Sequence, residues 1–247
     1  MSSDVGSHWF EPMADHMGSA YLRYSFTKGT AQEIDHIVSA LGLVPGMRVL
    51  DVGCGPGRHA YELAQRGITV HGIDISQTFV DLAQKSAPSG ATFQRMDARA
   101  LTFENEFDAA ICLCQGAFGL MTANGQDIDV LSGIRRSLKE GAGLALSAFN
   151  AYFAVKYFEQ ATFDAGTGVS HEVTEIRNQE GMGQTVDLWT GCYTPRELRI
   201  MLRTCHFEPH SISSVDPGAY REAPATTESS EFLVVAFASP FRREGDH

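Results

Sequence analysis

Residues 49–60 read VLDVGCGPGRHA, and this stretch decides how the rest of the chain is interpreted. An apolar run passes through three alternating glycines and then directly into a helical pattern. Glycine lets the backbone turn sharply and leaves no Cβ between the backbone and a ligand. The helix that follows presents free N–H groups at the turn. Ligands of open α/β sheets lie just beyond the carboxyl ends of the strands, so this loop predicts a ligand site.

Strand and helix patterns alternate around this loop. The segments between the apolar runs predict helices, one from about 58 to 66 and one that begins after Ser76, a good N-cap. Strict alternation predicts a parallel sheet with right-handed crossovers and helices on both faces, which is a doubly wound α/β fold. The predicted strands lie at 48–52, 69–73, 91–95, 107–114 and 144–149.

The alternation breaks after residue 150. Runs at 169–177 and 185–193 predict a β-hairpin laid over the edge of the sheet. Runs at 209–215 and 232–238 predict an antiparallel pair that ends the sheet, and the aromatic-rich N-terminal residues suit a helical lid. We therefore expect a single domain over 1–247, made of a lid segment (1–39), a cofactor-binding core (40–150), an inserted hairpin cap (151–193) and the C-terminal part of the sheet (194–247).

Composition and charge exclude several classes of protein. Of 247 residues 43% are hydrophobic, and 30 acidic against 19 basic residues give a formal net charge of −11. Such a surface repels polyphosphate, so we expect no nucleic-acid partner. No apolar run reaches the roughly 18 residues of a membrane-spanning helix, and the first residues lack the features of a secretory signal. We expect a cytoplasmic protein with no membrane contact and reduced cysteines, and the sequence leaves monomer and homodimer open.

An acid follows the second predicted strand. A carboxylate at Asp74 can accept both hydroxyls of a ribose. Residues 55–60 also match the loose dinucleotide pattern G-x-G-x-x-G/A, so the loop and Asp74 alone fit several nucleotide-like ligands. Asp51, just before the glycines, would oppose a diphosphate but suits an ammonium group. The ligand that these features fit is an adenosine that carries an amino acid.

These motifs resemble those of the class I S-adenosylmethionine-dependent methyltransferases of the small-molecule type. The stretch from Asp51 to Gly57 resembles the family's glycine-rich loop, and Met96-Asp97-Ala98 resembles the pair that contacts the adenine. The resemblance implies a Rossmann-like fold with a mostly parallel, seven-stranded sheet. It also implies S-adenosyl-L-methionine as cofactor, with S-adenosyl-L-homocysteine as its product. The implied cofactor-binding residues are Asp51, Gly53, Cys54, Gly55, Gly57, Asp74, Ile75, Asp97, Ala98, Cys114 and Tyr24.

The resemblance further implies methyl transfer, by in-line displacement, to an O, N or C atom of a small or medium-sized acceptor. The cofactor carries the reactivity, so the protein mainly positions the reactants and excludes water. We expect Gln115, Phe118, Trp189 and Tyr21 to bind the acceptor, although Phe118 and Tyr21 also suit plain packing. His171 is the candidate general base, although a solvated histidine is the commoner outcome. No acids and histidines cluster at ligand spacing, so no metal is expected.

Two other functions remain open from the sequence. The match at residues 55–60 and the acid at 74 also suit an NAD(P)-dependent oxidoreductase. A non-catalytic module that binds S-adenosylmethionine but has lost its acceptor site is the second alternative.

Overall fold

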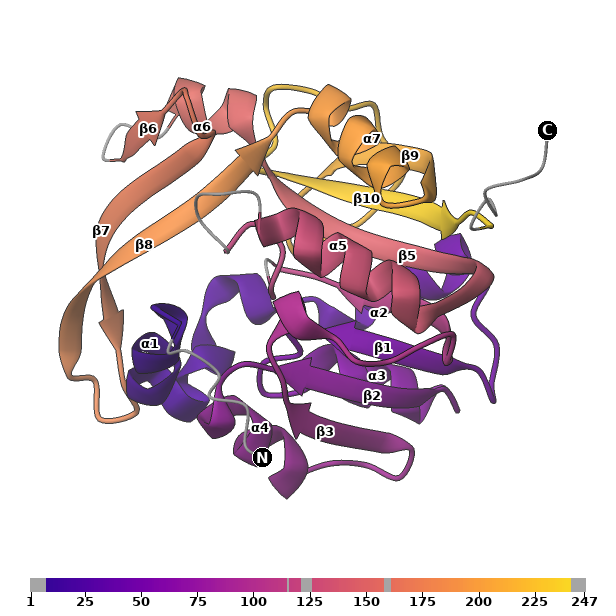
Figure 1. Ribbon diagram of the computed structural model, residues 1–247. Coiled ribbons are helices and arrows are strands. Elements are labelled where there is room, and N and C mark those ends of the chain that lie inside the picture. The colour runs from indigo at the N-terminus through magenta and orange to yellow at the C-terminus, as the bar shows by residue number, and fades with distance from the viewer. Residues whose placement is uncertain (1–7, 115, 121–125, 158–160, 241–247) are drawn as a thin grey trace.

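A sheet with helices on both faces forms the centre of the chain, seen here in a computed structural model (Figure 1). The structure describes residues 8–114, 116–120, 126–157 and 161–240. Five parallel strands run in the order β3, β2, β1, β4, β5. Their bounds, in that order, are Ala91–Arg95, Thr69–Asp74, Arg48–Val52, Phe107–Cys112 and Leu138–Asn150.

Two antiparallel strands complete the sheet beside β5. β10 (Glu231–Ala238) pairs with β5, and β9 (Phe207–Val215) pairs with β10. Together with the parallel strands they form the predicted, mostly parallel seven-stranded sheet, and the doubly wound α/β fold is confirmed.

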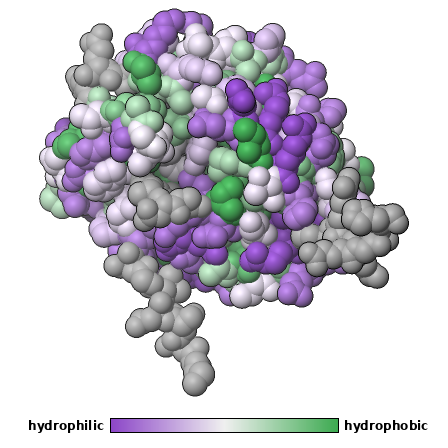
Figure 2. All heavy atoms as spheres, turned by 45° about the horizontal axis from the view of Figure 1, so that its top comes forward, coloured by the Kyte–Doolittle hydropathy of each residue, from purple (hydrophilic) through white to green (hydrophobic). Residues whose placement is uncertain are grey.

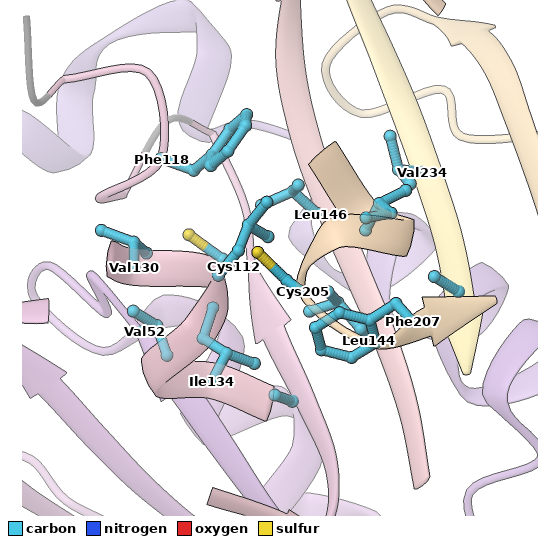
Figure 3. Close-up of a cluster of buried hydrophobic side chains, with 14 of the residues drawn as sticks. Val52, Cys112, Phe118, Val130, Ile134, Leu144, Leu146, Cys205, Phe207 and Val234 are labelled. Carbon is cyan, nitrogen blue, oxygen red and sulfur yellow. The ribbon is translucent and has the colours of Figure 1, made fainter. Parts of the chain in front are cut away.

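Helices cover the two faces of this sheet as separate groups. α2 (Thr30–Leu41), α3 (Arg58–Gln65) and α4 (Gln77–Lys85) pack on one face. α5 (Gln126–Ser137) and α7 (Pro195–Thr204) pack on the other. Alternate residues of a strand point to opposite faces, so the buried strands supply apolar side chains to both cores. Figure 3 shows the second core, where Val130 and Ile134 of α5 meet side chains of the central strands.

The hairpin cap extends from the edge of the sheet at which the parallel strands end. β7 (Val169–Arg177) and β8 (Gly183–Tyr193) form the predicted antiparallel pair, with a short β6 (Thr162–Asp164) beside β7. The end of β8 pairs with the end of β5 at Phe149 and Asn150. β10 already occupies one side of Phe149, so β8 takes the other side, just beyond the end of β4. The hairpin is therefore joined to the sheet by backbone hydrogen bonds.

The N-terminal residues form short helices beside the tip of this hairpin (Figure 1). The N-terminal segment comprises α1 (Phe10–Met17) and the 3-10 turns η1 (Gly18–Arg23) and η2 (Ser25–Thr27). The hairpin tip contacts it through His16 Nε2 and Met182 O, 3.1 Å apart, and through further polar contacts. The remaining short helices are η3 (Ala98–Ala100) and α6 (Ala151–Tyr157).

The outer surface is mainly polar. On the face seen in Figure 2, hydrophobic residues form small, separate patches among polar ones. In the part of the chain that the structure describes, no helix has both the length and the apolar character needed to cross a membrane.

Candidate functional site

The loop after β1 is shaped by glycines with positive φ. Gly53, Gly55 and Gly57 have φ values of 71°, 53° and 86°, a region that other residues enter at a cost. A Cβ on Gly53 would lie 2.0 Å from the backbone carbon of Gly116, so the loops after β1 and β4 touch backbone to backbone. A Cβ on Gly57 would meet the Tyr61 ring at 2.9 Å. These two glycines are therefore required for packing.

Gly55 differs because its missing side chain faces open space. The nearest atom to a Cβ at this position would be Cε1 of Tyr21, at 3.8 Å. The Gly55 N–H donates to Oδ2 of Asp74 at 2.8 Å, which ties the loop to the end of β2. Gly55 is thus the position of the loop that leaves room for another group beside the backbone.

Asp74 ends β2 and lines the same open space. Its Oδ1 accepts a hydrogen bond from the Ser76 N–H at 2.8 Å, in addition to the bond from Gly55. Burial raises the pKa of Asp74 to about 6, even though both of these backbone hydrogen bonds lower it. The carboxylate is therefore held rigidly at the cavity wall, and each oxygen keeps a lone pair for further donors.

Asp51 is buried beside the glycine loop and does not line the cavity. Its exposed fraction is 1%, and burial raises its pKa to about 7. No hydrogen-bond partner for its Oδ2 is present among the described residues. Cys54 is also buried, next to Asp51, where it packs into the core. Oδ2 of Asp51 can thus accept a further hydrogen bond, at the loop where the sequence predicts an ammonium group.

A cavity of about 370 Å³ opens between the loop, the N-terminal segment and the hairpin. Gly53, Gly55, Asp74 and Cys114 form its floor at the carboxyl edge of the sheet. A smaller cavity of about 140 Å³ continues past the end of β5, and both share Phe149, Leu188 and Thr190. The apolar walls of the larger cavity come from the N-terminal segment, α4 and the hairpin. They are Phe10, Met13, Met17, Tyr21, Tyr24, Phe26, Phe79, Ile176 and Leu188.

Two tyrosines of the N-terminal segment close this cavity. Tyr21 packs on Phe79 with ring centroids 4.9 Å apart, and burial raises the pKa of its hydroxyl. The Tyr24 hydroxyl accepts a hydrogen bond from the Arg177 N–H of the hairpin at 3.1 Å. The structure thus brings Tyr21 and Tyr24 to the cavity, as the sequence predicts.

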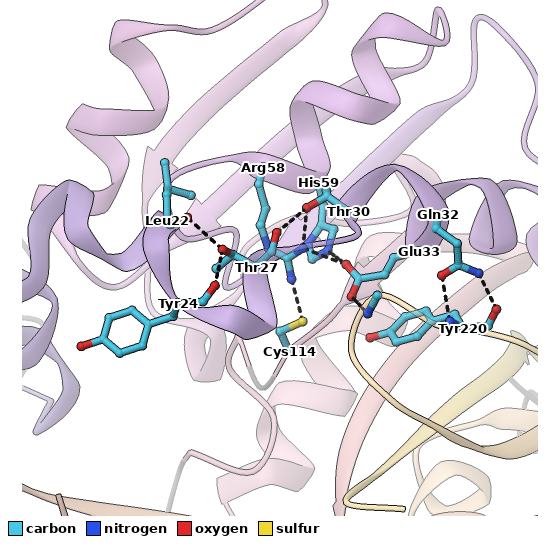
Figure 4. A network of polar contacts seen from close by, with 11 residues as sticks. Leu22, Tyr24, Thr27, Thr30, Gln32, Glu33, Arg58, His59, Cys114 and Tyr220 are labelled. Atoms are coloured by element: carbon cyan, nitrogen blue, oxygen red, sulfur yellow. Dashed lines mark hydrogen bonds and ion pairs between the residues drawn. The ribbon is translucent and has the colours of Figure 1, made fainter. Parts of the chain in front are cut away.

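A buried ion pair supports the cavity from behind (Figure 4). Glu33 of α2 accepts hydrogen bonds from Arg58 Nη1 at 2.7 Å, from His59 Nε2 at 2.9 Å and from the Gly218 N–H at 2.7 Å. Burial alone would raise the pKa of Glu33, but the hydrogen bond from His59 and the charge of Arg58 lower it to about 2. Burial lowers the pKa of His59 to about 4, so a charged Glu33 faces a neutral histidine.

Arg58 joins this network to the cavity. Its Nη2 donates to the Cys114 Sγ at 2.7 Å, and burial raises the pKa of that thiol. Cys114 has a φ of 51°, and this turn ends β4 at Cys112, two residues before the predicted end. One atom that could ligate a metal ion from each of Glu33, His59 and Cys114 lies within 4.8 Å of the other two. The Arg58 guanidinium, however, bonds to two of the three and already supplies the positive charge.

Other predicted residues lie outside the cavity. Asp97 forms an ion pair with Arg99 at 2.5 Å; burial opposes ionisation, but the Arg99 hydrogen bonds outweigh it and lower the pKa of Asp97. Ala98 is buried in η3, and Ile75 is half-buried after β2. Phe118 is fully buried in the core of Figure 3, so the structure supports its packing role. Gln115 lies outside the described residues.

His171 and Trp189 lie on the opposite face of the hairpin from the cavity. Side chains alternate along a strand, and Leu188 and Thr190 are the β8 residues that line the cavity. His171 and Trp189 instead stack on each other, with centroids 5.0 Å apart, in a separate depression. His171 Nε2 lies 2.8 Å from the Asp187 Oδ1. The expectations of a general base at His171 and a pocket wall at Trp189 therefore gain no support from the structure.

Two acids that the sequence reasoning missed lie at or behind the cavity. Glu33 could have been noticed as an acid next to Ile34, on the apolar face of the helix that also carries Ile37. Glu231 lines the cavity with an exposed fraction of 5%, and directly precedes the apolar run at 232–238. Only the register of β10 against β5, which pairs Glu231 with Phe149, brings it to the site.

Similarity to known proteins agrees with this arrangement. A model of the methyltransferase domain family matches residues 49–141. The cypemycin N-terminal methyltransferase of a Streptomyces species is 29% identical over 219 residues, which cover 80% of this chain and 86% of that protein. The CcbJ methyltransferase from Streptomyces caelestis has a similar structure, with a TM-score of 0.77 at 16% identity, covering 94% and 99% of the two chains.

A further solved structure, an S-adenosylmethionine-dependent methyltransferase from Methanosarcina mazei, has a TM-score of 0.62 at 25% identity. The match covers 82% of this chain and 97% of that one. The domain match covers the loop after β1 and the acid at the end of β2, and the structural similarity to the CcbJ methyltransferase covers 94% of the chain. Its motifs, its fold and these relatives support a class I S-adenosylmethionine-dependent methyltransferase.

Proposed function

We propose that the enzyme transfers a methyl group from S-adenosylmethionine to a small or medium-sized acceptor held in the cavity over the ends of β4 and β5. The observation that carries this proposal is the continuous floor from Asp74 through Gly55 and Gly53 to Cys114. A nucleoside at Asp74 would place its substituent along the glycines and toward the end of β4.

The residues present fit the cofactor at three points. Asp74 holds acceptor lone pairs at the cavity wall for the ribose hydroxyls. Gly55 leaves room that a Cβ would fill, along the path of the amino-acid part. Asp51 has a buried carboxylate oxygen in need of a donor, which suits an ammonium group or a water bound to it. S-adenosylmethionine supplies an electrophilic methyl group when it is bound.

The protein's own contribution is enclosure and orientation. The N-terminal segment and the hairpin wall the cavity with aromatic and methionine side chains, and Tyr24 links the two. We propose that they act as a lid and a cap that exclude water from the reacting groups. The Glu33–Arg58 ion pair fixes the position of Cys114 at the floor.

The test is calorimetric titration of the protein with S-adenosylhomocysteine and, separately, with NADH. We expect binding of the first alone, and Asp74→Asn should weaken that binding. Asp81→Asn, an exposed acid on α4, is the matched control and should bind normally. Binding of NADH alone would support the oxidoreductase alternative. Cofactor binding without transfer to any of a broad set of acceptors would favour the non-catalytic module.

A further inference from the structure

The smaller cavity beyond the end of β5 carries polar groups that the proposed methyl transfer does not use. Its volume is about 140 Å³, and it lies between the inner face of the hairpin cap, α6 and the end of β5. Its walls join those of the large cavity at Phe149, Leu188 and Thr190. A molecule bound in the large cavity can therefore extend into the smaller one.

Three polar side chains of the cap face this space from neighbouring positions. Ser170 of β7 lies directly opposite Thr190 of β8 in the antiparallel register, and Glu172 follows two residues after Ser170. Residues two apart on a strand share a face, and directly opposed residues have Cβ atoms about 4.5–5.5 Å apart. All three line the smaller cavity, whereas His171 lies in the depression on the outer face of the hairpin. The register thus places two hydroxyls and a carboxylate side by side.

These three groups can accept further hydrogen bonds. Ser170 and Thr190 are 9% and 7% exposed, and neither hydroxyl has a hydrogen-bond partner among the described residues. Glu172 is half-buried, and in the same part of the chain its carboxylate has neither an ion-pair nor a hydrogen-bond partner. The described lining of this cavity includes no lysine, arginine or histidine. Buried polar groups are normally hydrogen-bonded, so a ligand with N–H donors would satisfy groups that the protein leaves unsatisfied.

A primary ammonium group matches this set of acceptors. It carries one positive charge and three N–H donors, and the site offers a carboxylate and two hydroxyl oxygens. A half-buried carboxylate in a cavity that Leu188 and Ala154 also line is stabilised by a cationic donor. A carboxylate ligand would be repelled by Glu172, and a hydroxyl ligand would leave the charge of Glu172 without a partner. The site therefore favours an amine over an alcohol or an acid.

This subsite lies away from the reacting atoms. The methyl group is expected at the end of β4, near Cys114, whereas Thr190 lies close to Cys192, which pairs with Phe149 at the end of β5. Neighbouring strands are about 4.7–4.9 Å apart, so the subsite lies roughly one to two strand spacings, about 5–10 Å, from the reacting methyl group. An ammonium group bound there serves recognition and is not the methylated atom.

We propose that the acceptor is an elongated, mainly apolar molecule with a primary ammonium group, which Glu172, Ser170 and Thr190 bind in the smaller cavity while another atom of the molecule is methylated. This inference rests on the proposed methyl transfer. The aromatic and methionine walls of the large cavity hold the apolar part. The contacts of the ammonium group fix how far along the cavity the acceptor lies, so Glu172 determines specificity.

The experiment measures the binding of matched probes to the protein saturated with S-adenosylhomocysteine. The probes are phenylalkyl chains of two, four or six methylene groups that end in an ammonium, a hydroxyl or a carboxylate group. In calorimetric titrations at neutral pH, we expect at least one amine to bind about tenfold or more tightly than its matched alcohol, as for a charge-assisted contact, and the acids not to bind. Glu172→Gln should abolish this preference, and Thr190→Val should weaken amine binding by a smaller factor.

Controls separate this inference from the proposed function. Asp187→Asn alters an acid of the same hairpin that pairs with His171 on the outer face, and it should bind the amines as the wild type does. The melting temperature and the affinity for S-adenosylhomocysteine should be unchanged in Glu172→Gln.

If S-adenosylhomocysteine binds but no amine does, or if the matched alcohol or acid binds as tightly as the amine, the inference is overturned and the proposed function stands. Equal amine affinity in Glu172→Gln and the wild type overturns it too. Failure of the wild type to bind S-adenosylhomocysteine refutes the proposed function itself.

Discussion

Acidification should weaken cofactor binding through Asp74. Burial raises the pKa of this carboxyl to about 6, so protonation begins just below neutral pH. Both carboxylate oxygens already accept backbone N–H groups, from Gly55 and Ser76, and only the ionised form keeps lone pairs for the two ribose hydroxyls as well. The proton and the cofactor therefore compete for the same group.

The size of the effect follows from the fraction ionised. With a pKa of about 6, roughly one molecule in eleven carries the ionised carboxylate at pH 5, so the dissociation constant should rise about tenfold between pH 8 and pH 5. The affinity should rise with pH and level off above the pKa, since a bound donor favours the charged form.

Calorimetric titration with S-adenosylhomocysteine at half-unit steps from pH 5 to pH 8 measures this profile. Asp74→Asn should bind more weakly at pH 8 and lose most of the pH dependence. Asp51, whose pKa burial raises to about 7, titrates in the same range, so Asp51→Asn identifies its share of the profile. A flat profile in the wild type, or an unaltered one in Asp74→Asn, would refute the assignment of Asp74 to the ribose.

Three further changes test the site and its support. Gly55→Val should abolish S-adenosylhomocysteine binding, because the new side chain projects into the cavity, and should lower the melting temperature, because valine is strained at a φ of 53°. Gly53→Ala should also destabilise the fold, because its Cβ would collide with the Gly116 backbone. Phe118→Ala should lower the free energy of unfolding by about 3–5 kcal/mol in urea titrations, and a loss below about 1 kcal/mol would place the ring outside the core. Glu33→Gln should cost about 3–5 kcal/mol by the same measurement, since it leaves a buried guanidinium without its ion partner; wild-type stability in this variant would contradict the buried ion pair.

Local signals predict the central sheet closely. β1 and β3 have the predicted bounds, and Ser76 Oγ caps α4 through the Phe79 N–H at 3.2 Å. Apolar runs and caps report local structure, so these elements need no knowledge of the remaining chain. β5 starts earlier than predicted, at Leu138, because that residue pairs with Phe107 directly after α5.

The cavity depends on the register between strands, which the hydrophobic pattern of the sequence does not reveal. The alternation of side chains on β8 points Leu188 inward and Trp189 outward, and the register against β7 then carries His171 outward as well. The register of β10 brings Glu231 to the cavity. Motif spacing locates the loop and Asp74, since both lie at strand ends, whereas the walls of the cavity come from segments that lie far apart in the sequence.

A crystal structure of the protein with S-adenosylhomocysteine would show whether the cofactor lies across the ends of β1 and β2. We expect the ribose hydroxyls on the Asp74 carboxylate, the amino-acid part along Gly53 and Gly55, and the sulfur directed toward the end of β4 beside Cys114. Ligand density elsewhere, with the ends of β1 and β2 empty, would contradict this placement.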